Sequence, residues 1–103
     1  MKWLDIINNM INNTSVERSS IVLLVDLLFR MNMISGTDKA NLLTILNYDT
    51  YIISDIIDSI VSIYENYEHL DHIVCKLALN KYVRDGEITS AKRDAILSNM
   101  VKK

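Results

Sequence analysis

The stretch SSIVLLVDLLFRMNM, residues 19–33, decides the fold class of this 103-residue chain. It is apolar on nearly every side, and a helix that is hydrophobic all round is a buried one. We therefore predict a central helix on which the others pack. A membrane span needs about 20 predominantly apolar residues, and Asp26, Arg30 and Asn32 interrupt this run, so no membrane partner is expected. Because Asp26 and Arg30 are four residues apart, we expect them to pair along the wet edge of the helix.

The rest of the sequence also favours helices. It contains no proline, and its only glycines, Gly36 and Gly86, suit the ends of helices. Apolar residues recur every three to four positions, which predicts helices over residues 2–11, 36–46, 50–67 and 68–84 and from residue 89 onward. Thr14, Ser35 and Thr89 are of the type that caps helix starts, and Thr14 with Glu17 has capping-box form. The predicted fold is all-α, a small antiparallel bundle of about six short helices.

A shift of 54 residues brings the two halves of the sequence into register. Arg30 then falls on Arg84, Ile34 on Ile88, Ser35 on Thr89, Lys39 on Arg93, Leu42 on Ile96 and Leu43 on Leu97. An internal repeat would divide the bundle into two three-helix halves. The alternative is that any two amphipathic helix–turn–helix units align in this way once their turns are matched. In both cases we expect a single helical domain, residues 1–103.

The composition indicates the compartment in which the protein is expected and the apolar character of its surface. Cys75 is the only cysteine, so no disulfide can form within the chain, and a reducing compartment is expected. The first residues lack the apolar run and cleavage site of a signal peptide, which favours a cytoplasmic protein. Hydrophobic residues make up 50% of the chain, a high share for a domain this small. Part of that surplus is expected in an interface.

Charge is divided unevenly along the chain, although its net value is only −2. Up to Cys75 there are four basic and ten acidic residues, and from Lys76 onward there are seven basic and three acidic ones. Such segregation can guide one molecule, or one half of the chain, onto another. The alternative is two solvated faces that bind nothing.

His69, His72 and Cys75 bring together both histidines and the only thiol of the chain. Imidazole and thiolate are ligands of zinc and copper. Successive steps of three residues drift by about 60° around a helix, so His69 and Cys75 diverge and we predict no metal site. The sequence offers neither a third group to orient a Cys75–His72 nucleophile nor a glycine-rich phosphate loop. No cofactor and no enzymatic activity are therefore expected.

The last predicted helix suggests an alternative function. It carries Lys92 and Arg93, and Lys102 and Lys103 follow at its end. The second helix of a DNA-reading helix–turn–helix presents donors of this kind to bases and phosphates. The acidic balance of the whole chain disfavours this alternative, because phosphate contacts dominate affinity for nucleic acid.

The helix predicted over residues 68–84 has two apolar stripes. One contains Leu70, Ile73, Val74 and Leu77, and the other contains Cys75, Leu79 and Tyr82. We predict that the second stripe, Cys75 with Leu79 and Tyr82, forms an interface with a partner.

The leading functional expectation is a non-enzymatic protein–protein interaction module. The spacing of Leu28, Ile34, Ser35, Leu42 and Leu46 resembles that of the helix–turn–helix in death-fold modules, which are six-helix adaptors. The apolar helix faces favour a homodimer, or an inhibitor that docks on a host protein. Heavy use of Ile, Asn, Asp, Lys and Tyr is typical of an AT-rich viral or phage genome, which would place the protein in the host cytoplasm.

Overall fold

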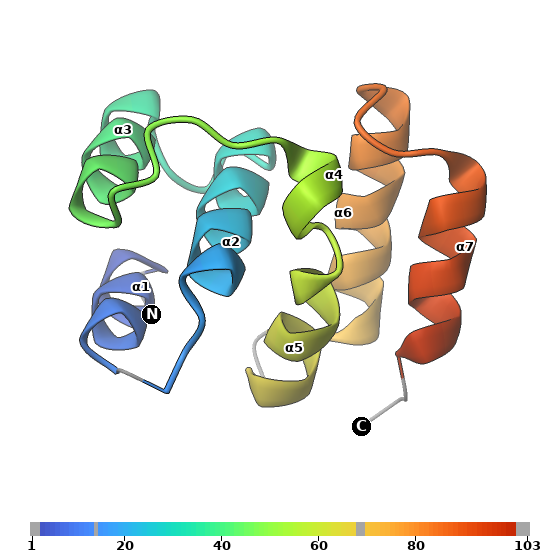
Figure 1. Ribbon diagram of the computed structural model, residues 1–103, viewed down its shortest axis with the longest axis horizontal. Helices are drawn as coiled ribbons and strands as arrows, with labels where there is room; N and C mark the ends of the chain where they lie inside the picture. Colours follow the sequence, from blue (N-terminus) through green and yellow to red (C-terminus); the bar gives the residue numbers. More distant parts are fainter. Residues whose placement is uncertain (1–2, 14, 68–69, 101–103) are drawn as a thin grey trace. The chain divides into compact units, whose positions relative to one another are not determined.

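The structure is a computed structural model that describes residues 3–13, 15–67 and 70–100 (Figure 1). The described residues form seven α-helices and no strand, which confirms the predicted all-α fold. The helices are α1 (Trp3–Asn12), α2 (Arg18–Arg30), α3 (Gly36–Ile45), α4 (Ile53–Ile56), α5 (Ser59–Asn66), α6 (His72–Arg84) and α7 (Ser90–Asn99). Packing divides the chain into two compact units, Met1–Tyr51 and Ile52–Lys103. None of the described helices has the length and apolar character that a membrane span requires.

The first unit is organised around α2, which packs against both α1 and α3. Every residue from Ile21 to Leu28 is buried, so the predicted central helix is confirmed. The prediction of a wet edge at Asp26 is wrong, because that residue is only 1% exposed. At the start of α2, the Arg18 guanidinium Nη1 donates to the Leu46 carbonyl at 2.7 Å and so joins α2 to the end of α3.

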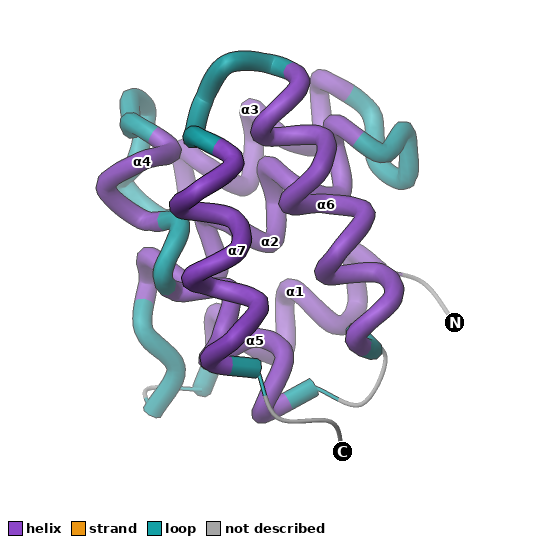
Figure 2. Tube along the Cα trace, turned by 90° about the vertical axis from the view of Figure 1, so that its right-hand side faces the viewer, coloured by secondary structure: helices purple, strands orange, loops and turns teal. Residues whose placement is uncertain are grey.

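The second unit packs α6 against α5 and α7, and Figures 1 and 2 both show α6 beside α7. The helix predicted over residues 50–67 is interrupted: the Ile60 and Val61 amides bond to carbonyls three residues back, at Ile57 and Asp58. Such bonds belong to a tighter turn than the α-helix. The interruption follows a run rich in isoleucine, whose branched side chain lowers helix propensity. It divides the predicted helix into α4 and α5.

Side-chain caps set three of the helix starts. Ser35 accepts from the Asp38 amide at 3.0 Å, Thr89 from the Lys92 amide at 3.1 Å, and Asp71 from the Val74 amide at 2.8 Å. The predicted caps at Ser35 and Thr89 are therefore confirmed. The predicted capping box at α2 is not formed as expected: Glu17 is the N-cap without a side-chain cap bond, and Thr14 lies outside the described residues.

The two units share local geometry at the shift of 54 residues. Helices α2 and α6 have 13 residues each and α3 and α7 have 10 each, with starts and ends at the shifted positions. The turns between them also correspond. The Met33 amide donates to the Leu28 carbonyl at 2.8 Å, and the Glu87 amide to the Tyr82 carbonyl at 2.9 Å. Asn32 and Gly86, which are equivalent under the shift, have φ of 60° and 79°.

Replacement of Gly86 is expected to report on this shared turn. Gly86→Ala should cost about 1 kcal/mol of unfolding free energy, because an L side chain is disfavoured at positive φ. A Cβ there would meet no atom within 4 Å, so the cost comes from the backbone alone. Gly86→Asn is the control and should cost less, because Asn32 holds the equivalent conformation. Urea denaturation measures both, and equal losses for the two variants would contradict the comparison.

Candidate functional site

The outward face of α6 is the candidate functional site. Asp71 caps the start of the helix, and the left-handed turn at Gly86 follows its end at Arg84. Cys75, Ala78, Leu79 and Tyr82 face the core. Helical spacing places Ile73, Leu77, Asn80 and Arg84 in one row on the opposite side, and we call this row the α6 strip.

The stripe predicted as an interface is the buried one, whereas in the other stripe Leu70 is buried and Ile73 and Leu77 are exposed. Cys75 and Leu79 are 0% exposed and Tyr82 is 1% exposed, so these residues do not offer the predicted interface. Ile73 is 69% exposed and Leu77 is 53% exposed. Both stripes are apolar, and periodicity alone does not say which one faces inward. The polar residues Asn80 and Arg84 lie on the same side of the helix as Ile73 and Leu77, and they could have indicated that this side is exposed.

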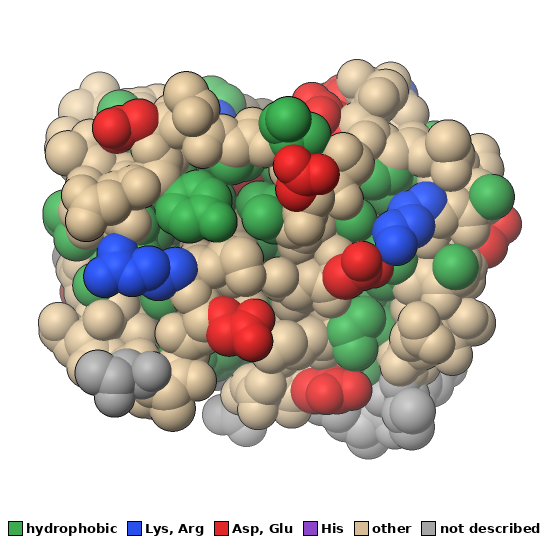
Figure 3. Space-filling model, viewed as in Figure 1, with side chains coloured by type: hydrophobic (Ala, Val, Ile, Leu, Met, Phe, Trp, Pro, Cys, Tyr) green, Lys and Arg blue, Asp and Glu red, His purple; other side chains and the backbone are tan. Residues whose placement is uncertain are grey.

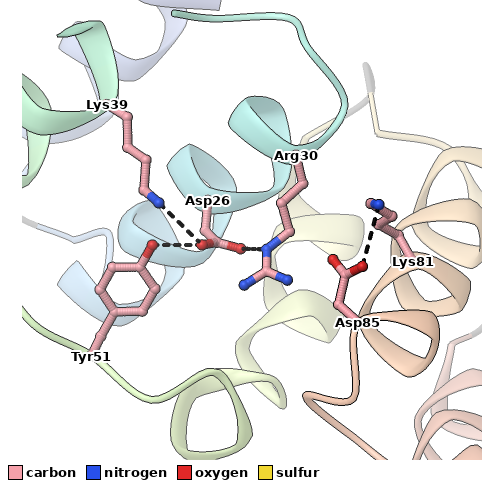
Figure 4. A network of polar contacts seen from close by, with 6 residues as sticks. All are labelled: Asp26, Arg30, Lys39, Tyr51, Lys81 and Asp85. Carbon is pink, nitrogen blue, oxygen red and sulfur yellow. Dashed lines mark hydrogen bonds and ion pairs between the residues drawn. The ribbon is translucent and has the colours of Figure 1, made fainter. Parts of the chain in front are cut away.

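The α6 strip is positively charged. Lys76 and Arg84 are exposed, and neither forms an ion pair with any residue that the structure describes. The Lys81 ammonium lies 3.3 Å from the Asp85 carboxylate, so this cation is already paired (Figure 4). The strip therefore offers two apolar side chains at its N-terminal half and unpaired positive charge beside and beyond them.

A second polar arrangement lies in the first unit, around the buried carboxylate of Asp26 (Figure 4). Arg30 Nε lies 2.7 Å from Oδ2, and the Tyr51 hydroxyl donates to Oδ1 at 2.5 Å. The ammonium of Lys39 lies 3.8 Å from Oδ1. The predicted Asp26–Arg30 pair is thus present. Lys39 and Tyr51 also join it, which the spacing of the sequence does not predict. This cluster ties α2 to α3 and to the segment after α3.

A hollow of about 460 Å³ lies over this cluster. Phe29, Lys39, Asp49 and Tyr51 are among its lining residues. The Lys39 ammonium is 4.5 Å from the centre of the Phe29 ring and 5.7 Å from that of Tyr51, which is the geometry of a cation–π contact. The cationic group is thus held by the protein's own rings and carboxylate. The contacts of Lys39 thus join α3 to α2 and to Tyr51.

The candidate metal ligands are not assembled in the described part of the chain. The His72 ring lies edge-on to Tyr64 with centroids 6.0 Å apart, and Cys75 faces the core. His69 lies outside the described residues. Among residues 3–13, 15–67 and 70–100 there is no group of three potential ligands. Burial also raises the pKa of Tyr67, so its phenol keeps its proton well above neutral pH.

The candidate nucleic-acid residues on α7 make bonds within the second unit. The Lys92 ammonium lies 2.9 Å from the Asp58 carboxylate, and Arg93 donates from Nη1 to Asn80 Oδ1 at 3.1 Å. Arg93 Nε also lies 3.1 Å from Asp94. Lys102 and Lys103 lie outside the described residues. The Lys92–Asp58 pair joins the basic end of the chain to its acidic part, so some of the segregated charge is used inside the second unit.

Comparison with known proteins adds no assignment. No protein-family model matches the chain, and searches of the curated proteins and of the solved structures found no match.

Figure 3 shows hydrophobic side chains at the surface between charged ones. Exposed large apolar residues are Met33, Ile45, Ile52, Ile73 and Leu77. Of these, Ile73 and Leu77 share one helix face.

Proposed function

We propose that this chain is a non-enzymatic protein–protein interaction module that contacts its partner through the α6 strip. The observation that carries the proposal is the pair Ile73 and Leu77, which are 69% and 53% exposed and four residues apart on one face of a 13-residue helix. Apolar residues four apart on a helix are the usual anchors of helix docking. Lys76 lies beside this pair, and Arg84 lies two helical turns beyond Leu77.

The two apolar anchors supply only part of the free energy that a contact needs. Full burial of a Leu or Ile side chain is worth about 1.5–3 kcal/mol, and these two are already partly covered. The pair together therefore supplies on the order of 2–3 kcal/mol before the costs of association. Charged residues at the rim are then needed to orient the partner, and Lys76 and Arg84 are suitably placed.

Replacement of both anchors is expected to abolish partner binding without loss of folding. Ile73→Ser with Leu77→Ser removes the apolar part of the strip at positions that the core does not use. Chemical cross-linking and mass determination should show a complex, with a second copy or with another protein of the source cell, for the wild type only. The circular dichroism spectrum should be unchanged.

The matched control is Ile52→Ser, which removes an apolar side chain that is 63% exposed but lies before α4. This variant should bind as the wild type does. Equal recovery of the complex with the double α6 variant would contradict the proposal, and so would loss of binding with Ile52→Ser alone.

The alternative of a helix–turn–helix that reads DNA through α7 has less support. Lys92 and Arg93 each have an acceptor within the second unit, so DNA binding would have to displace those contacts. Salt-dependent binding to duplex DNA, lost on Lys92→Gln with Arg93→Gln, would favour this alternative.

We infer further that each unit contains one copy of a three-helix repeat, with α1–α3 equivalent to α5–α7, while α4 precedes the second copy. The equivalent helix ends, caps and turns support this inference, and a side-chain contact repeats as well. Lys39 on α3 reaches Asp26 on α2 at 3.8 Å, and at the shifted positions Arg93 on α7 reaches Asn80 on α6 at 3.1 Å. Unrelated helix pairs would have no reason to share the cap, the turn and this contact at one shift.

The expectations of a viral or phage origin, of an inhibitor role in the host cytoplasm and of an antiparallel bundle remain proposals. Homodimer formation is part of the interaction proposal, and it is made specific in the next subsection.

A further inference from the structure

We propose that the occupant of the α6 strip is helix α3 of a second copy of this chain, bound in the antiparallel direction. The inference rests on the proposed function, because it names the partner of the same α6 face. It starts from Ile45, an exposed apolar residue at the end of α3, which is 57% exposed.

Ile45 belongs to a row on the outer side of α3. Asp38, Asn41 and Ile45 follow one another at steps of three and four residues, and we call this row the α3 strip. Asn41 is exposed and Asp38 is half-buried, whereas the core-facing residues of this helix are Leu42 and Leu43. The Asp38 carboxylate forms no ion pair with another described residue.

The two strips have the same spacing in opposite directions. On α6, the unpaired charge of Arg84 follows the apolar Leu77 by seven residues. On α3, the carboxylate of Asp38 precedes the apolar Ile45 by seven residues. Seven residues span about 10 Å of helix. When the helices run antiparallel, Ile45 can therefore lie on Leu77 and Ile73 while Asp38 lies beside Arg84.

The charges of the two helix ends favour the same orientation. Asp38 is in the first turn of α3 and Arg84 is in the last turn of α6, where each sign of charge suits the helix dipole. An antiparallel pair also places the positive end of one dipole beside the negative end of the other. In the parallel direction Asp38 would lie at the end of α6 that bears Asp71, which is a like charge.

This contact joins two different surfaces of the same chain. A copy that offers its α6 strip to one neighbour still has a free α3 strip. That strip can bind the same neighbour, which closes a dimer, or a further copy, which extends the assembly as concentration rises. A self-complementary antiparallel α6–α6 pair through Ile73 and Leu77 would bring Lys76 of the two copies together, and that like charge disfavours it.

Charge reversal tests the pairing. Arg84→Asp and Asp38→Arg should each weaken self-association by about tenfold or more, since an attraction becomes a repulsion at the rim. The double variant, Arg84→Asp with Asp38→Arg, restores opposite charges between copies and should recover association. Sedimentation equilibrium over a range of concentrations measures all four proteins, and circular dichroism checks that each is folded.

Mixing the two single variants gives an independent result. Each variant alone places like charges at the contact, whereas every contact between the two variants pairs an aspartate with an arginine, so the mixture should recover association with the two chains in alternation. Ile45→Ser should weaken the association of the otherwise wild-type chain without any change of charge. It serves as the test of the α3 strip if a charge-reversal variant does not fold.

The inference is overturned if the wild type stays monomeric at every concentration, if the double reversal associates no better than the single ones, or if Ile45→Ser leaves association unchanged. If, in any of these cases, a complex with another protein still requires Ile73 and Leu77, the proposed function stands and the α6 strip binds that other protein. A complex that depends on neither strip would contradict both.

Discussion

Leu24→Asp is expected to unfold the first unit. Leu24 lies in the middle of α2 and is 0% exposed, and its neighbours along the helix are buried as well. The substitution removes a packed side chain and places a carboxylate where no partner is available. Loss of a buried Leu costs about 2–5 kcal/mol, and an unpaired buried charge costs several more. The sum is comparable with the whole stability of a small domain, which is about 5–15 kcal/mol.

Thermal denaturation followed by circular dichroism measures this result. Two further substitutions serve for comparison, one at a buried position and one at an exposed position. Leu79→Asp on α6 is also expected to unfold the protein, because Leu79 is 0% exposed and faces the core. If Leu79 lay in the interface that the sequence predicts, the same change would disrupt assembly and leave the fold intact. Ile73→Asp puts the same carboxylate on the exposed side of α6 and should leave the melting curve nearly unchanged. A cooperative transition for Leu24→Asp at the wild-type temperature would contradict the assignment of α2 as the centre of its unit.

Asp26→Ala is expected to destabilise the first unit by about 2–4 kcal/mol. Removal of one partner from a buried pair leaves the other charge uncompensated, which typically costs about 3–5 kcal/mol. Here the loss should be smaller, since Arg30 and Lys39 retain 19% and 25% side-chain exposure and can turn toward water. Tyr51 would also lose the acceptor that it reaches at 2.5 Å.

Asp26→Asn separates the contribution of the hydrogen bond with Tyr51 from that of the charge that faces Arg30 and Lys39. It keeps an oxygen that can accept from Tyr51 but removes the charge that faces Arg30 and Lys39, and it reproduces Asn80, the shifted equivalent. Its loss of stability in urea denaturation should lie between those of the wild type and of Asp26→Ala. Wild-type stability for Asp26→Ala would show that the cluster contributes nothing to the fold.

The sequence predicts the helices best where a cap and a glycine or asparagine turn bound them. Ser35 and Thr89 identify the starts of α3 and α7, and the all-round apolar run identifies α2 as buried. The interruption between α4 and α5 could not be predicted, because the apolar spacing of residues 50–67 is that of one continuous helix. The break depends on backbone bonds of the Ile57 and Asp58 carbonyls, which apolar spacing does not report.

The candidate site could be predicted only in part. Periodicity identifies both apolar stripes of α6, but the choice of Cys75, Leu79 and Tyr82 as the outward stripe was wrong because tertiary packing decides which stripe is covered. The burial of Asp26 was missed for a related reason. Its i+4 partner Arg30 is evident in the sequence, whereas Lys39 and Tyr51 reach it only after the chain has folded.

The most direct test of the account is sedimentation equilibrium of the wild type and of the Ile73→Ser, Leu77→Ser double variant at increasing concentration. The account predicts that the average mass of the wild type rises above the 11.9 kDa of one chain, while the folded double variant stays at that value. The same mass for both proteins at every concentration would contradict the claim that the outward face of α6 binds a second copy.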